Sequence, residues 1–285
     1  MSSSTATIPA PQNRLLIAFG KAAAIYKRDR RLALSYDMAF IIQWLQIIVQ
    51  IISFYFIATL VPRKGLHTGL LGPVPYFSYV VVNLAFARFQ LTALQSFQTA
   101  IRGDQMLGTL EVVMATPTTL PTIVLSTGLW GFTLTLMQVL VALGTSMLLG
   151  LQLHVNLLTT FVFVILTIAC MSPLGVMAAS TIMTFKQNAP TQFVAGSAAS
   201  LLGGVLFPVD KLPLWLQKVS WCLPITHSLQ GIREGLLEAM PLSNPIMAGD
   251  ALWLLAATAI LMPLSLFIFA RSVSLARRDG TLGHY

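Results

Sequence analysis

The sequence predicts an all-helical integral membrane protein with six transmembrane helices. The first observation is composition: of 285 residues, 56% are hydrophobic and only 9% are charged, whereas soluble domains carry roughly 25% charged residues. The second is that apolar residues occur in runs of about 18 or more, the length that a helix needs to cross a hydrocarbon core of ~30 Å. Helices are expected because lipid offers no partner to unpaired backbone groups.

The predicted elements follow in order along the chain. Residues 1–11 are polar and expected to be disordered, and residues 12–285 form a single membrane domain. Residues 12–36 predict a basic amphipathic helix in the membrane interface, with a solvated juxtamembrane arm as the alternative. Spans are predicted at about 38–60, 75–100, 120–149, 157–184, 190–207 and 251–271. Pro173 is expected to kink the fourth span.

The loop between the last two spans, residues 208–250, predicts a helical hairpin. Two short amphipathic segments are separated by Pro224, and Trp215 and Trp221 suit the membrane interface. We expect this hairpin to enter the outer leaflet and return without crossing it.

The basic residues predict how the chain is oriented. Eleven Lys and Arg lie on the side of both termini and five on the other side. Because basic residues collect in cytoplasmic loops, both termini are expected in the cytoplasm of a multi-pass cell-membrane protein (inner or plasma membrane). The same rule accounts for the net charge of +8, so no nucleic-acid partner is expected.

The loop between spans two and three, residues 103–117, predicts a short cytoplasmic helix. Thr109 is a suitable N-cap, and Pro117 ends the helix. Leu110, Val112 and Val113 would leave apolar surface exposed. Such a helix needs a partner protein or an interfacial bed.

These residues carry a family resemblance. The segment GTLEVVMATPTT resembles the signature of the type V ABC exporter permeases, also called ABC type-two permeases. The segment GGVLFPVDKLPLWLQKVSWCLPITHSLQGIRE is similar to the end of that family's fifth span and the helices after it. The order of elements agrees over essentially the whole chain. One departure is that only Arg102 and Asp104 are charged just before GTLE, where family members often carry more charges.

The resemblance implies that the 103–117 loop holds a coupling helix that docks into a cytosolic ATPase. The positions that would make this contact are Asp104, Gly108, Thr109, Leu110, Glu111, Thr116 and Pro117. The chain has no phosphate-binding loop, no metal-ligand spacing and no catalytic arrangement. ATP and Mg are therefore expected on separate ATPase subunits, and this chain is expected to hold no cofactor. The implied activity is export of a lipid-like, amphipathic or drug-like molecule.

Arg88 lies near the middle of span two, where a charge costs ~2.5 kcal/mol or more. One interpretation is that it lines a substrate path and meets an anionic head group of a membrane lipid. The other is that carbonyls and glutamines satisfy it, or that it snorkels. Asn83 of the same span, and Gln43, Gln46 and Gln50 on one face of span one, are further candidates for the path.

Small residues in span five predict close helix packing. Gly196, Ser200 and Gly204 are spaced four apart. The resemblance places spans one and five at the seam with a second permease copy or a paralogue. Packing within one chain is the alternative.

Three competing functions are weighed. Export of a lipid-linked polysaccharide would use the same architecture but favours aromatic rings along the path. A membrane-embedded lipid-modifying enzyme would need catalytic acids or histidines, for which only His227, Glu234 and Glu238 qualify. A secondary transporter is disfavoured because no acidic residue lies within a predicted span and no inverted repeat is visible.

Overall fold

The computed structural model describes residue 20 and residues 23–31, 37–60, 66–68, 71–106, 128–185 and 201–278. The long helices are α2 (Asp37–Leu60), α3 (Tyr76–Met106), α6 (Leu129–Leu148), α7 (Leu157–Phe185) and α11 (Pro245–Arg278). The shorter elements are β1 (Leu66–Thr68), β2 (Leu71–Val74), the 3-10 turn η1 (Val209–Lys211), α9 (Leu214–Cys222) and α10 (Pro224–Leu237).

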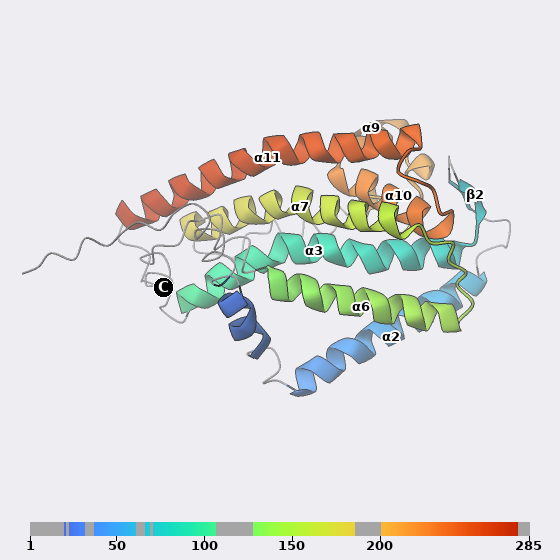
Figure 1. The fold of residues 1–285 in the computed structure, drawn as a ribbon, viewed down its shortest axis with the longest axis horizontal. Helices are drawn as coiled ribbons and strands as arrows, with labels where there is room; N and C mark the ends of the chain where they lie inside the picture. The colour runs from blue at the N-terminus through green and yellow to red at the C-terminus, as the bar shows by residue number, and fades with distance from the viewer. Residues whose placement is uncertain are drawn as a thin grey trace, which may run out of the picture.

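The long helices form an elongated bundle (Figure 1). Among the described residues, five helices are long and apolar enough to cross a membrane: Ile41–Leu60, Tyr76–Thr99, Leu129–Leu148, Leu157–Ser180 and Pro245–Leu275. These helices agree with the predicted multi-pass helical membrane protein. Another predicted span covers residues 190–207, but the structure describes only residues 201–207 of it. The count of six spans therefore stays a prediction.

Helices α3 and α7 form the centre of the bundle. Tyr79, Val81 and Asn83 of α3 are fully buried, as are Phe163 and Cys170 of α7. Helix α2 lies at the periphery and exposes Ile41, Leu45 and Phe56. An apolar helix surface of this kind requires lipid or another protein to cover it.

The described residues agree with the predicted all-helical class, and the connection after α2 adds only a small antiparallel pair, β1 and β2, in which Leu66 pairs with Val74. The bounds of the predicted coupling helix need correction, because helix α3 continues to Met106. Residues 103–106 thus belong to the last turn of span two and do not begin a separate helix, since no proline interrupts the chain from Tyr76 to Met106.

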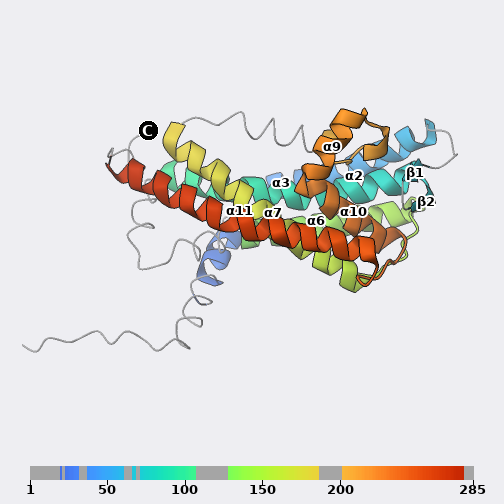
Figure 2. The same ribbon diagram turned by 90° about the horizontal axis from the view of Figure 1, so that it is seen from above.

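The two short helices predicted in 208–250 are present as α9 and α10, and Pro224 is the first residue of α10. Proline suits this position because its missing N–H would be unpaired there anyway. With β1 and β2 they lie at the end of the bundle opposite the C-terminal end of α11 (Figures 1 and 2). Whether this hairpin enters lipid stays a prediction.

Backbone hydrogen bonds attach α10 to the segment that leads into α7. His154 N–H donates to Leu236 O at 3.0 Å, and Asn156 N–H donates to Gly235 O at 2.8 Å. These bonds satisfy carbonyls at the C-terminal end of α10, which have no partner within their own helix. At the opposite end of the bundle, the helical residues 23–31 contact α6 through the rings of Tyr26 and Trp130, 5.6 Å apart.

Glycines allow the neighbours of α7 to approach it closely. A Cβ at Gly175 of α7 would overlap the backbone oxygen of Ala93 in α3. A Cβ at Gly231 of α10 would overlap the ring of Phe163 in α7. Small residues at helix contacts are a general device in membrane bundles, where close packing replaces the hydrophobic effect.

Replacing Gly175 with alanine should push α3 away from α7, because a backbone oxygen cannot move aside as a side chain can. We expect a loss of about 1–3 kcal/mol in the free energy of unfolding, measured by thermal unfolding of the purified protein in detergent. Gly144→Ala in α6 is the matched control, because nothing lies within 4 Å of its added Cβ. Equal unfolding temperatures for the two variants would contradict the close contact.

Candidate functional site

The predicted coupling residues fall almost entirely outside the described residues. Gly108, Thr109, Leu110, Glu111, Thr116 and Pro117 all lie in the segment 107–127. Asp104 is described only as part of the last turn of α3. Their contact with an ATPase therefore stays a prediction.

Arg88 and Gln50, two of the predicted path residues, meet between α3 and α2. Arg88 Nη2 donates a hydrogen bond of 2.5 Å to Gln50 Oε1. Arg88 is partly buried, and the other two glutamines on α2, Gln43 and Gln46, are exposed. A buried charge is tolerable when polar groups take its hydrogen bonds, and Gln50 supplies such a group here.

Asn83 and Gly204 also meet, but inside the chain. The Tyr79 hydroxyl and Asn83 Nδ2 both donate to Gly204 O, at 2.6 and 3.1 Å. Gly204 has φ +73, a left-handed conformation that favours glycine. The residue lies in a buried turn after the helix end at 201–202. Gly204 therefore contacts α3 of its own chain, which agrees with the alternative of packing within one chain. A seam with a second copy stays a prediction, and Gly196 and Ser200 lie outside the described residues.

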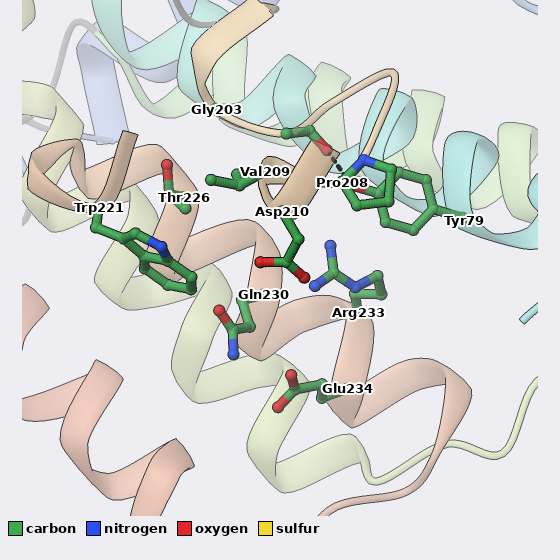
Figure 3. A pocket seen from close by; sticks show the side chains of 11 residues that line it. Tyr79, Gly203, Pro208, Val209, Asp210, Trp221, Thr226, Gln230, Arg233 and Glu234 are labelled. Atoms are coloured by element: carbon green, nitrogen blue, oxygen red, sulfur yellow. Dashed lines mark hydrogen bonds between the residues drawn. The ribbon is translucent and has the colours of Figure 1, made fainter. Parts of the chain in front are cut away.

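A cavity of about 80 Å³ lies where the first turn of α3, the turn at 203–210 and α10 meet. Its lining combines aromatic, polar and charged side chains (Figure 3). The lining residues are Tyr79, Gly203, Gly204, Pro208, Val209, Asp210, Trp221, Thr226, Gln230, Arg233 and Glu234. The cavity at the hairpin end of the bundle thus has a largely apolar lining that includes several charged and polar groups.

Arg233 projects from α10 into this cavity. Its Cζ lies 4.9 Å from the centre of the Tyr79 ring, a distance at which the ring attracts the guanidinium. The Asp210 carboxylate points toward the same guanidinium (Figure 3). Arg233 Nε is buried and has no hydrogen-bond partner.

Glu234 is the next residue of α10 and is only 1% exposed. Burial raises the pKa of its carboxyl to about 7, although Arg233 and a hydrogen bond with Gln230 favour the ionised form. Its Oε2 atom is buried and has no hydrogen-bond partner. The cavity therefore contains one unpaired cationic donor and one unpaired acidic oxygen on adjacent residues.

A second polar cluster joins α10 to α11. His227 Nδ1 lies 2.7 Å from Asp250 Oδ1, and His227 Nε2 lies 2.8 Å from the carbonyl oxygen of Trp221. The Trp253 ring stacks on the imidazole with centroids 4.5 Å apart. A carbonyl only accepts, so Nε2 carries a proton. Burial lowers the pKa of His227, but the bonds to Asp250 and Trp221 outweigh it and raise the pKa overall.

The residues weighed for a lipid-modifying enzyme do not form an acid–base pair. His227 and Glu234 are seven residues apart on α10, about 10 Å along its axis. Both ring nitrogens of His227 are already hydrogen-bonded. A general base needs a free position within reach of its substrate, so the histidine is better explained as a link between α10 and α11.

Sequence reasoning missed Tyr79 and Arg233 as cavity residues and Gly231 as a packing contact. The signal for the glycine was present, because Gly231 and Gly235 are four residues apart, a small-residue spacing that favours close helix contact. No local pattern pairs Tyr79 with Arg233, which are 154 positions apart, since only the fold brings them together.

Comparison with known proteins agrees with the bundle and its hairpin. The family model described as ABC-2 type transporter matches residues 22–237, which include α2, α3, α6, α7, α9 and α10. No curated protein matches the chain.

The His227–Asp250 link should make stability depend on pH. The pKa of His227 is raised in the folded state, so protonated His227 stabilises the folded protein. This stabilisation is complete below the unfolded-state pKa of about 6.5 and is lost as pH rises through the folded-state pKa. The unfolding temperature should therefore fall above pH 6.5, and Asp250→Asn should flatten that fall. A variant that retains the full slope would show that another group is responsible.

Proposed function

Because the chain belongs to the ABC-2 type transporter family, we propose that it is the permease of an exporter whose ATPase is a separate chain. The family match over residues 22–237 is the observation that carries the proposal. As a member, the chain is a multi-pass membrane component of an ABC transporter, and its family works with ABC ATPase subunits. Outward transport of a lipid-like, amphipathic or drug-like molecule is the finer part of the proposal.

The proposed orientation places the end of the bundle near Met106 in the cytoplasm and the α9–α10 hairpin outside. The excess of Lys and Arg on the side of the termini supports it. The contact between Tyr26 and Trp130 places the basic helical residues 23–31 against the start of α6. In this orientation, the N-terminal helix and the connection between α3 and α6 lie at the cytoplasmic face of a cell membrane. A cytosolic ATPase, with its ATP and Mg, would bind at that face.

A second copy of the chain, or a paralogue, is part of the proposal. The exposed apolar surface of α2 supports it, and a path between two copies would expose Gln43 and Gln46 to the transported molecule. Arg88, hydrogen-bonded to Gln50 across the gap between α3 and α2, would stand at the edge of this path. An ATP-driven closure would move the helix around Glu111 and, through α3, the Arg88 region.

Altering the coupling helix should uncouple the permease from its ATPase. We expect Glu111→Ala to weaken co-purification with the ATPase and deletion of Gly108 and Thr109 to abolish it, since the contact depends on this short helix. Glu238→Ala is the matched control, because Glu238 lies at the opposite end of the bundle, at the C-cap of α10. If all variants retain the ATPase and stimulate it equally, the coupling assignment is wrong.

Arg88→Leu should lower transport by about tenfold, the factor that corresponds to a lost charge-assisted hydrogen bond. Assembly with the ATPase should persist, because Arg88 lies within the bundle. The measurement is ATP-driven loss of a fluorescent amphipathic probe from proteoliposomes, with Gln50→Leu as the control that removes only the hydrogen-bond partner. Unchanged transport in Arg88→Leu would remove this residue from the path.

A further inference from the structure

We propose that the cavity at the hairpin end binds the head group of an outer-leaflet aminophospholipid, with its phosphate at Arg233 and its primary ammonium at Glu234. The inference rests on the proposed orientation, because it needs the hairpin to lie at the outer leaflet. It goes beyond the transport proposal by assigning a lipid site within one chain, away from the Arg88 region.

The cavity has the size and position for a head group. Its volume of about 80 Å³ accommodates about six water-sized groups at 10–15 Å³ each. Its lining includes two exposed residues, Asp210 and Trp221. The neighbouring helix α9 exposes Leu214 by 78% and Trp215 by 67%. Exposed tryptophan and leucine on an amphipathic helix favour the head-group level of a bilayer, so the cavity lies where a head group would be.

The unpaired atoms in the cavity define the chemistry of the ligand. Arg233 Nε is a donor without a partner, and Glu234 Oε2 is an acceptor without one. Leaving such buried atoms unpaired is costly, more so for charged groups. A single ligand that satisfies both carries an anionic oxygen and an N–H cation within one head group. Phosphoethanolamine has this arrangement, since two carbons separate its amine from its phosphate ester oxygen.

The same two unpaired atoms discriminate against other head groups. Phosphocholine has the same charges, but its quaternary nitrogen has no N–H to donate to Glu234 Oε2. Phosphoglycerol has the phosphate but no cation. Arg233 presents five N–H groups, so it can serve a phosphate oxygen and the nearby Asp210 at the same time. The proposed preference is therefore for an amine that keeps an N–H over a quaternary amine.

The test is lipid competition on the unaltered full-length chain. The purified protein is placed in nanodiscs containing equal amounts of phosphatidylethanolamine, phosphatidylcholine and phosphatidylglycerol, and retained lipid is measured by native mass spectrometry. We expect phosphatidylethanolamine to be retained about tenfold over phosphatidylcholine, the factor for one charge-assisted hydrogen bond. Across mono-, di- and trimethylation of the amine, the main fall in retention should come at trimethylation, which removes the last N–H. Equal retention across this methylation series would overturn the proposal.

Two variants locate the site. Glu234→Gln should abolish the preference for an amine that keeps an N–H, while Glu238→Gln, on the same helix but outside the cavity lining, should keep it. Arg233→Gln should lower retention of all three lipids. If Glu234→Gln retains the full preference, the amine binds elsewhere and the proposal fails. The methylation series needs no variant, so it decides the question even if a substitution prevents folding.

Two further outcomes would also overturn the proposal. Soluble phosphoethanolamine that binds as tightly as the lipid would identify a free metabolite as the ligand. If the protein retains no lipid, the two unpaired atoms are satisfied by water and not by a head group. Neither result depends on the ATPase, so failure here is distinct from failure of the exporter proposal, which co-purification tests.

Discussion

The close approach of three helices to α7 is the contact on which the rest of the described chain depends. Helix α3 touches α7 at Gly175, α10 touches it at Gly231, and α11 packs along it. Within lipid, association rests on van der Waals contact and hydrogen bonds, so a side chain at either glycine would separate the elements that form the cavity and the Arg88 region.

The polar groups of the bundle follow from this packing. Once α10 is seated on α7, its C-terminal carbonyls meet the amides of His154 and Asn156, and His227 reaches Asp250 on α11. Each pairing removes a group that would be costly to bury alone. Some pairings are incomplete: Asn83 and Asp250 each keep one buried oxygen unpaired, and Arg233 and Glu234, which line the cavity, each keep one buried atom unpaired. Unpaired polar atoms that line a cavity are a reason to look for a ligand there.

Local patterns predicted much of the fold, and long-range contacts were beyond them. Apolar runs located the helices because crossing a membrane imposes a length and a composition on each segment. Pro224 correctly separated α9 from α10. The turn at Gly204 was not predicted, since a glycine needed for a left-handed turn looks the same in sequence as one needed for helix packing. Arg88 was singled out by its charge, but its partner Gln50, 38 positions away, was fixed only by the fold.

The account depends most on the α9–α10 hairpin lying outside the cell, opposite the end that meets the ATPase. The two native cysteines allow a direct measurement, because Cys222 of α9 is exposed and Cys170 of α7 is buried. A membrane-impermeant maleimide should label Cys222 in intact cells, and Cys222→Ser should abolish the labelling. Labelling of Cys222 only after the cells are permeabilised would place the hairpin in the cytoplasm and contradict the account.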